Sequence, residues 1–217
     1  MKLTVGAAQP GALQMRLDWR MGDLRWRIFQ AALAADGANP RLAALLARDA
    51  SALPPVRPLA ADDRVETFDC GVAELDAGLR RDAAEVGLVS EDARGAWVAI
   101  DDGQVVAYYA TRWRRLINAA QPTAAETPLL LVRRLALDRR WRRGRPEAAA
   151  DLFAHLLHEV ISWPAPRRPA AIVAFALTPA TRRCFLRWGA RPIAEMVNPR
   201  SIMMSMADIE RARHVRP

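Results

Sequence analysis

Between residues 128 and 161, the spacing of the hydrophobic residues changes from that of a buried strand to that of an amphipathic helix. This stretch carries the clearest pattern of the chain. Residues 128–138 are almost continuously apolar, which is typical of a strand buried on both faces. After an arginine-rich segment with one glycine, apolar residues recur at the spacing of an amphipathic helix, at Leu152, Phe153, Leu156, Leu157, Val160 and Ile161. The pattern predicts a strand, a loop and a helix whose first N–H groups face the loop and suit a phosphate. A βα unit with a solvated basic loop explains the same pattern.

The first 59 residues predict two short helices and a linker. Residues 21–35 have apolar side chains at helical spacing and are followed by the helix stop Gly37. Residues 40–48 form a second helical pattern, with Asn39 as its cap and Pro40 in its first turn. Residues 51–59 are rich in proline and predict an extended linker or the approach to a strand. Two such short helices bury little apolar surface by themselves, so they must pack on the rest of the chain or on a partner.

The remaining patterns alternate between helix and strand. A helical stripe lies within residues 65–79, and Asp102-Gly103 joins two β-rich runs as a hairpin turn. Residues 114–127 predict an irregular polar connection. The later elements are a buried strand at 171–176, a helix from Thr178 to Gly189, a strand at 201–206 and a polar tail at 207–217 that forms a frayed helix. This order predicts an α/β fold, more closely an α+β mixed sheet with helices on both faces.

Composition narrows the class of partner. The chain has 217 residues, which fits one domain with an extension, and 52% hydrophobic residues provide enough material for a core. Its net charge of +8 comes almost entirely from arginine. A basic surface favours a polyanion, either nucleic acid or a phosphate-bearing cofactor.

Disulfide, metal and membrane functions find little support. Cys70 and Cys184 are the only cysteines, too few for a disulfide framework. His155 and His158 lie three apart, but no Cys or carboxylate set accompanies them, so we expect no metal. No apolar run approaches the ~20 residues that span a bilayer, and no secretory segment is evident. We therefore expect a cytoplasmic protein without a membrane partner.

Four ordered motifs resemble the GCN5-related N-acetyltransferase (GNAT) family. They are FDCGVAELDAGL at 68–79, VVAYY at 105–109, VRRLALD at 132–138 and A-x-x-P-A-x-x-x-C-F-x-x-W-G at 176–189. The match covers residues 54–212 and is best to the toxin branch, which acetylates the amino group of charged tRNA. The resemblance implies a GNAT acyl-CoA N-acyltransferase fold, with acetyl-CoA as the acetyl donor and tRNA as a partner.

The N-terminal segment resembles the neutralising C-terminal tail of the antitoxins that pair with these toxins. The matching positions are Phe29, Leu33, Asn39, Leu42, Leu45, Leu46 and Arg48. The resemblance implies a helical extension at 1–52, a linker at 53–59, a GNAT domain at 60–212 and a tail at 213–217. The extension would then inhibit its own domain, or an antitoxin-like protein would bind in its place. Two ordinary packing helices explain the same residues.

The cofactor loop departs from the family pattern, in which glycines expose successive N–H groups to pyrophosphate. The matching run keeps Gly144, but Pro146 has no N–H and Glu147 adds a carboxylate. Either the arginine side chains offset this by binding phosphate directly, or the loop no longer holds pyrophosphate. The resemblance also implies that the backbone of the preceding strand holds the thioester and the pantetheine arm. The predicted cofactor residues are therefore Leu135, Ala136, Leu137, Arg142, Arg143, Gly144 and Arg145.

The second departure is Phe185, which stands where the family has the tyrosine that protonates the departing CoA thiolate. The general acid is therefore missing, and such groups typically contribute 10²–10⁴-fold to the rate. Tyr108 and Tyr109 are the only tyrosines of the chain. Either one takes over the role, or both are packing residues.

Two main functional hypotheses follow. The first is an acetyltransferase of the toxin–antitoxin type that grips tRNA phosphates with Arg112, Arg114, Arg115, Arg139, Arg140, Arg182 and Arg183. The second is a catalytically degenerate GNAT pseudoenzyme that binds RNA or protein. A transferase for small-molecule or protein amines is a third, and a homodimer is compatible with each.

Overall fold

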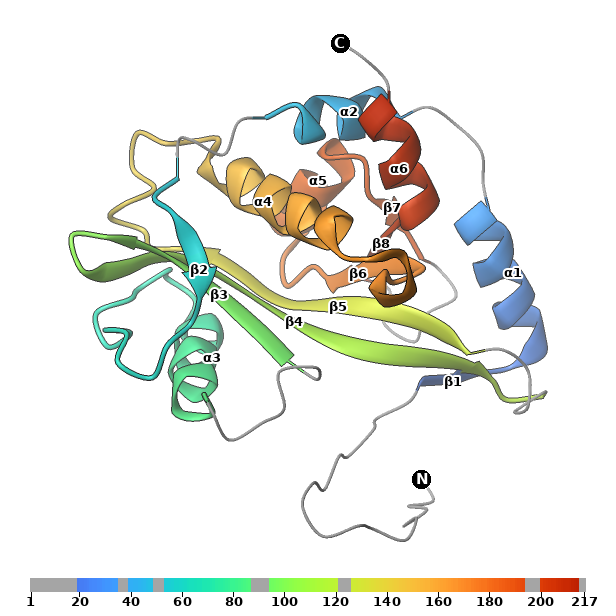
Figure 1. Cartoon of the computed structure of the whole chain (residues 1–217), viewed down its shortest axis with the longest axis horizontal. Helices are drawn as coiled ribbons and strands as arrows, with labels where there is room; N and C mark the ends of the chain where they lie inside the picture. The colour runs from blue at the N-terminus through green and yellow to red at the C-terminus, as the bar shows by residue number, and fades with distance from the viewer. Residues whose placement is uncertain are drawn as a thin grey trace, which may run out of the picture.

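A central sheet with helices on both faces forms the protein (Figure 1). The structure is a computed structural model that describes residues 19–34, 39–48, 53–86, 94–120, 126–193 and 200–214. The eight-stranded sheet has the order β2-β3-β4-β5-β6-β8-β7, and β1 pairs in parallel with β4 outside this path. The predicted α/β mixed sheet is confirmed.

The described helices and strands follow the predicted order, with some additions. The strands are β1 Trp19–Met21, β2 Val56–Pro58, β3 Arg94–Asp101, β4 Gln104–Asn118, β5 Thr127–Leu137, β6 Ala171–Phe175, β7 Arg191–Pro192 and β8 Ser201–Ser205. The helices are α1 Asp23–Ala34, α2 Pro40–Leu46, α3 Ala73–Ala84, α4 Ala148–Ser162, α5 Pro179–Arg187 and α6 Met206–His214. A short 3₁₀ helix, η2 Ala165–Arg167, follows α4.

The best-predicted local feature is the hairpin between β3 and β4. Asp102 and Gly103 both have a positive φ, 48° and 70°, as a tight turn between twisted strands requires. The predicted helix caps are also confirmed. The Asn39 side chain accepts hydrogen bonds from the amides of Arg41 and Leu42, and the Thr178 hydroxyl accepts one from Thr181.

Three local predictions were wrong. Residues 114–118 continue β4 instead of starting an irregular connection, because β5 and β1 pair with this part of the strand. The helix predicted within residues 65–79 begins later, at α3. The C-terminal tail is a packed helix, since Ile209 of α6 is fully buried. In addition, part of the predicted linker forms β2, which pairs with β3.

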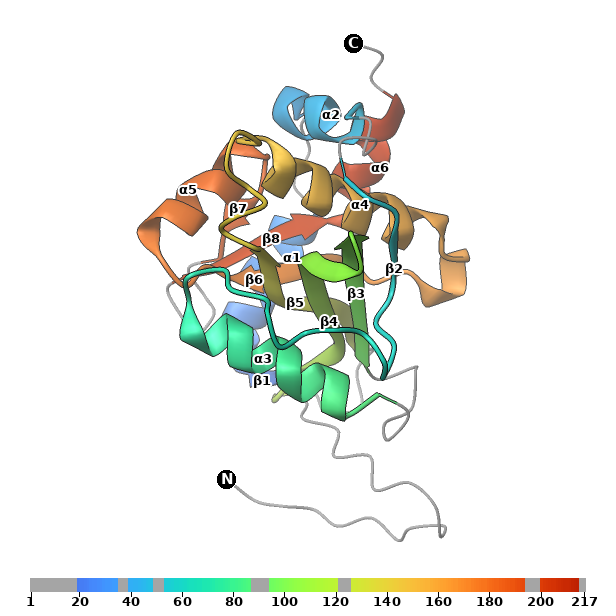
Figure 2. The same cartoon turned by 90° about the vertical axis from the view of Figure 1, so that its left-hand side faces the viewer.

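The two faces of the sheet carry different helices (Figure 2). On one face, α4 packs against the sheet with α2, α5 and α6 around it, and Phe153 of α4 lies in this core. On the other face, Leu79 of α3 packs against residues of β3, β4 and β5. The buried Phe29 of α1 covers the far end of that face. The apolar core is therefore divided between the two faces of the sheet, and both N-terminal helices contribute to it.

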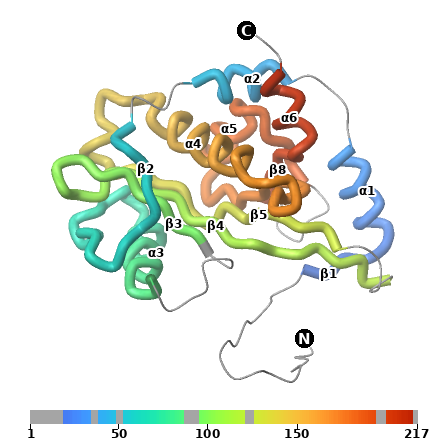
Figure 3. The backbone as a smooth tube through the Cα atoms, in the orientation of Figure 1, coloured from blue at the N-terminus to red at the C-terminus, as the bar shows by residue number. Residues whose placement is uncertain are grey.

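The N-terminal helix α2 lies beside the C-terminal helix α6 and the start of α4 (Figure 3). Leu42 and Leu45 of α2 are buried in the same core as α4 and α6. The Asn39 amide donates to the backbone oxygen of Gly189, 2.9 Å away, and His158 of α4 contacts the backbone oxygen of Leu46 at 2.9 Å. The extension is thus fixed to the domain by both apolar and polar contacts.

Candidate functional site

A cavity of about 290 Å³ opens where β5 and β6 separate. The two strands pair only from Leu129–Val132 to Ala171–Ala174, whereas β5 continues to Leu137. Within the described chain, no strand pairs with the β6-facing edge of β5 beyond Val132, so its backbone groups there are accessible to a ligand. The cavity is lined by β5, the end of β6, the start of α3, the loop before α4, and α5.

A bulge in β5 shapes the floor of this cavity. Ala110 pairs with Arg134 and Thr111 with Val132, so Arg133 is the extra residue. Successive residues of a regular strand point to opposite faces, but here both Arg133 and Arg134 reach Asp82 of α3. The distances from their guanidinium nitrogens to the carboxylate oxygens are 3.3 and 2.6 Å. The bulge thus directs two cations to the α3 side of the cavity.

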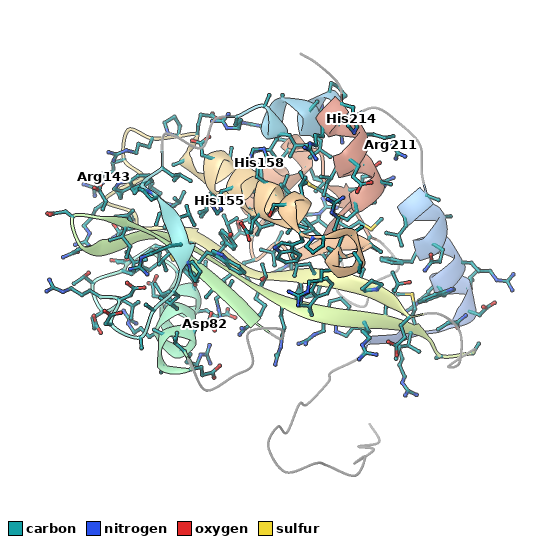
Figure 4. All side chains as sticks on the ribbon, in the orientation of Figure 1. Asp82, Arg143, His155, His158, Arg211 and His214 are labelled. Atoms are coloured by element: carbon teal, nitrogen blue, oxygen red, sulfur yellow. The ribbon has the colours of Figure 1, made fainter. Side chains whose placement is uncertain are left out.

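Gly78 makes this arrangement sterically feasible. A Cβ atom at this position would lie 2.1 Å from Nε of Arg134, so only glycine lets the guanidinium cross α3 without a shift. Asp82 lies on the opposite side of the sheet from His155 and His158 (Figure 4). The pairing of Arg133 and Arg134 with Asp82 was not predicted, although the adjacent arginines in a buried strand were a signal for it.

The loop between β5 and α4 closes one end of the cavity. Asp138 is buried and accepts hydrogen bonds from the amides of Arg140 at 2.8 Å and Trp141 at 3.4 Å, which fixes the first turn of the loop. Burial acts to raise the pKa of Asp138, but the Arg140 guanidinium and the backbone amides outweigh it, and its pKa lies below 3.8. The carboxylate therefore stays charged and holds the loop.

Several backbone amides at this loop have no protein partner. In the part of the chain that the structure describes, no hydrogen bond is donated by the N–H groups of Arg143, Gly144, Glu147 and Ala149. Gly144 adopts a left-handed φ of 76°, and Ala149 lines the cavity. Unpaired amides at the start of a long helix suit a phosphate, so the residues present fit the pyrophosphate of acetyl-CoA.

The predicted cofactor residues divide into two groups. Leu135, Ala136, Leu137 and Arg142 line the cavity. Arg143, Gly144 and Arg145 do not line it and lie on the exposed loop. The Arg145 guanidinium lies 4.4 Å from the ring centre of Trp141 and donates to its backbone oxygen at 2.7 Å, so this side chain is engaged within the loop. Figure 4 labels Arg143 at the tip of the loop.

Phe185 lies in the cavity wall, at the position predicted from the motif. It is 5% exposed and packs edge-on against Phe153 and Trp188, with ring centres 5.1 and 5.3 Å apart. Cys70 and Cys184 line the same cavity, and burial raises the pKa of the Cys70 thiol to about 12. No hydroxyl occupies the Phe185 position, and the Cys70 thiol is a very weak acid.

The two tyrosines lie elsewhere. Tyr108 is fully buried beneath α3, and its hydroxyl donates to the backbone oxygen of Leu75 at 2.6 Å. Tyr109 is buried on the opposite face of the sheet, where its ring stacks on Trp97. Its hydroxyl oxygen lies 3.2 Å from Nδ1 of His155. Burial raises the pKa of both hydroxyls, and neither residue lines the cavity. Their use as a general acid stays a prediction, and their placement favours the packing role.

The predicted nucleic-acid arginines are spread over three surfaces. Arg112, Arg114 and Arg115 follow the far half of β4, and Arg182 and Arg183 lie on α5. Arg139 and Arg140 are in the loop after β5 and pair with carboxylates. The charged nitrogens lie 2.6 Å from Asp69 and 3.1 Å from Asp138, respectively. The structure does not gather these seven residues into one cluster.

None of the residues that line the cavity belongs to β1, α1 or α2, as far as the structure describes these segments. Residues 1–18 of the predicted extension lie outside the described residues. Among the described residues, no group of three metal-ligating side chains comes together, and no helix is long and apolar enough to cross a membrane.

Comparison with solved structures identifies the architecture. AtaT complexed with acetyl-methionyl-tRNAfMet is 20% identical, with a TM-score of 0.60 over 72% of this chain and 96% of that one. The AtaTR complex bound with acetyl-CoA is 22% identical, with a TM-score of 0.62 over 72% and 95%. The chain has the GNAT fold. The KacTA–DNA complex also matches, at 19% identity and a TM-score of 0.57 over 72% and 95%. At such identities the likeness establishes the GNAT fold alone.

The GNAT fold is detectable in three dimensions but not in sequence comparisons. No protein-family model matches the chain, and neither does any curated protein. The four motifs predicted the GNAT fold correctly. They lie at the start of α3, the first half of β4, the bulged β5 and the helix α5.

Proposed function

We propose that the protein is an acetyl-CoA-dependent N-acetyltransferase of the toxin–antitoxin type, whose acceptor is the amino group of a charged tRNA. The observation that carries the proposal is the cavity between the separated strands β5 and β6, which reaches the unpaired amide of Ala149 in the first turn of α4. A cavity of this shape suits a long thioester ligand with a phosphate at one end. The similarity to toxins solved with acetyl-CoA and with acetylated tRNA supports the same choice.

The roles follow from the placement of the residues. The free edge of β5 at Leu135, Ala136 and Leu137 binds the pantetheine arm through backbone hydrogen bonds. The amides of Gly144 and Ala149, with the Arg142 guanidinium, bind the pyrophosphate. Acetyl-CoA would supply the activated acetyl group. The acceptor amine would form an amide bond with the carbonyl carbon, the thioester C–S bond would break, and CoA would leave as the thiol with the proton that the amine releases. The chain orients the two reactants, which by itself accelerates such a reaction.

Binding of tRNA is proposed to rest on the arginine-rich surface. The chain carries a net charge of +8, and Arg182, Arg183 and the arginines of β4 lie on elements next to or continuous with the cavity walls. Such contacts are electrostatic, so binding should weaken steeply as salt increases. An antitoxin-like protein is a second proposed partner, because one of the similar structures is an AtaT mutant toxin bound to the C-terminus of the antitoxin AtaR.

Phe185 favours a second candidate, a catalytically degenerate binding module. The cavity wall has no hydroxyl where the family has its tyrosine. A protein of this kind would bind CoA, RNA or a partner protein without efficient acetyl transfer. The acetyltransferase and the binding module both require the cavity, but only the acetyltransferase turns over acetyl-CoA efficiently.

The test is a transfer assay with the full-length protein, labelled acetyl-CoA and a pool of aminoacylated tRNA. The proposal expects label on the amino group of at least one aminoacyl-tRNA, and uncharged small amines should not compete. Cofactor binding without transfer to any acceptor would support the binding module instead. Transfer to small amines that outcompete charged tRNA would contradict the proposed acceptor.

A further inference from the structure

The clearest polar link between the N-terminal extension and the domain lies next to the proposed phosphate site. Arg48, which follows α2, extends its guanidinium to the first turn of α4. Its Nε lies 2.7 Å from Oδ1 of Asp151, and its Nη1 lies 3.0 Å from Oε2 of Glu147. One arginine therefore binds two carboxylates at the end of α4 that borders the cavity.

The position of these carboxylates around α4 is informative. Glu147 and Asp151 are four residues apart and share the face of α4 that contacts α2. Ala149 lies between them in sequence, on the opposite side of the helix, and lines the cavity. Arg48 thus holds both carboxylates on the side of α4 that faces away from the cavity.

Without this arginine, the two carboxylates would oppose phosphate binding. Glu147 is the N-cap residue of α4, and its side chain makes no capping hydrogen bond. A carboxylate at this position that lost its cation would be drawn to the unpaired amides of the first turn, where pyrophosphate is proposed to bind. Asp151 has a side chain only 4% exposed and would be left as a buried, uncompensated charge.

We infer that Arg48 is a positioning residue of the acetyl-CoA site, which keeps the start of α4 available for the pyrophosphate by holding Glu147 and Asp151 away from it. The inference rests on the proposed function. It also changes the role of the extension. By supplying Arg48, the N-terminal segment supports cofactor binding instead of blocking it, in accord with a cavity that α1 and α2 do not line.

The test measures ligand binding to full-length variants. Two ligands are used: acetyl-CoA, and S-acetylpantetheine, which lacks the pyrophosphate and the nucleotide. Arg48→Met should weaken acetyl-CoA binding by about tenfold, for two reasons. The released Glu147 carboxylate competes with the pyrophosphate for the amides of α4, and the positive charge of Arg48 near the phosphate is lost. Binding of S-acetylpantetheine should stay within about twofold, because it carries no phosphate to bind at the start of α4. Arg41→Met, which removes an exposed arginine from α2, the helix that precedes Arg48, is the matched control and should change neither.

Rescue separates positioning from a general loss of structure. Adding Glu147→Gln to Arg48→Met should restore most of the acetyl-CoA affinity, whereas Glu147→Gln alone should change it by less than about twofold. Glu147 is exposed, so this single variant should fold normally. If Arg48→Met does not fold, Arg48→Lys takes its place, because a lysine keeps the charge for Asp151 but cannot bridge both carboxylates. The same rescue by Glu147→Gln is then expected.

The inference is overturned if Arg48→Met binds acetyl-CoA as the wild type does, or more tightly, since the latter would make the extension inhibitory. Equal weakening of both ligands, without rescue by Glu147→Gln, would show a purely structural role and would also overturn it. If the wild-type protein binds neither ligand, the proposed function itself fails, and this inference fails with it. These outcomes are distinct.

Discussion

At the residue scale, Phe185 is the position that most directly affects the chemistry. Its ring fills the cavity wall between Phe153 and Trp188, but it cannot donate a proton. Phe185→Tyr should therefore raise the rate of acetyl transfer to charged tRNA, by roughly 10²-fold if general acid catalysis limits it. The affinity for acetyl-CoA should change little. The readout is the single-turnover rate with labelled acetyl-CoA.

Phe153→Tyr is the matched control, because it adds the same hydroxyl to a neighbouring ring that does not line the cavity. This variant should lose stability and gain no rate. An equal gain in both variants, or no gain in Phe185→Tyr, would contradict the proposed role of the position.

Asp138 connects a single carboxylate to the shape of the cofactor loop. Its pKa in the folded protein lies below 3.8, so its contribution to stability is complete above the unfolded value and is lost as pH falls through the folded value. Asp138→Asn should lower the free energy of unfolding by roughly 1–3 kcal/mol at pH 7. The difference in the free energy of unfolding between the wild type and Asp138→Asn should narrow below about pH 4. Urea unfolding from pH 3 to 7 measures this, and a gap that does not depend on pH would contradict it.

At the scale of elements, the extension is part of the folded core. Leu42 of α2 is fully buried among residues of α4 and α6, whereas Leu24 of α1 is 72% exposed. Leu42→Ala should lower the free energy of unfolding by about 2–5 kcal/mol. Leu24→Ala should change it by less than about 0.5 kcal/mol. Chemical denaturation of both variants tests whether α2 docks, and a similar small effect for both would show that it does not.

The elements that could be predicted were those set by local chemistry. The Asp102-Gly103 turn, the Asn39 and Thr178 caps and the apolar face of α4 depend on neighbouring residues, and all agree with the structure. The far half of β4 was missed because its pairing comes from β5 and from β1, whose residues lie 97 positions before their partners in β4. The C-terminal helix α6 was missed as a packed element because its apolar contacts are with α2 and the core.

The candidate site was only partly predictable, for the same reason. The strand motif placed Leu135, Ala136 and Leu137 at the cavity, and Phe185 joined them from α5. The partnership of Arg48 with Asp151 spans 103 residues, and no local pattern points to it. The bulge that turns Arg133 and Arg134 toward Asp82 likewise depends on the register between β4 and β5.

At the scale of the whole molecule, charge governs the encounter with the proposed acceptor. A net charge of +8, nearly all arginine, should make tRNA binding strongly dependent on salt. Arg183→Ala, on the exposed surface of α5, should weaken binding of all charged tRNAs alike and lower the slope of log affinity against log salt by about 1. Arg27→Ala, an exposed arginine of α1, should leave that slope unchanged. Filter binding at several salt concentrations gives both slopes, and equal effects of the two variants would argue against a defined tRNA surface.

The central claim is that the cavity between β5 and β6 binds acetyl-CoA. The most direct measurement is a calorimetric titration of acetyl-CoA into the full-length protein, whose folding is first checked by circular dichroism. The account predicts saturable binding at one site per chain, with an affinity that falls when Arg142 is changed to methionine. Absence of binding to the well-folded protein, or binding that is indifferent to Arg142, would contradict it.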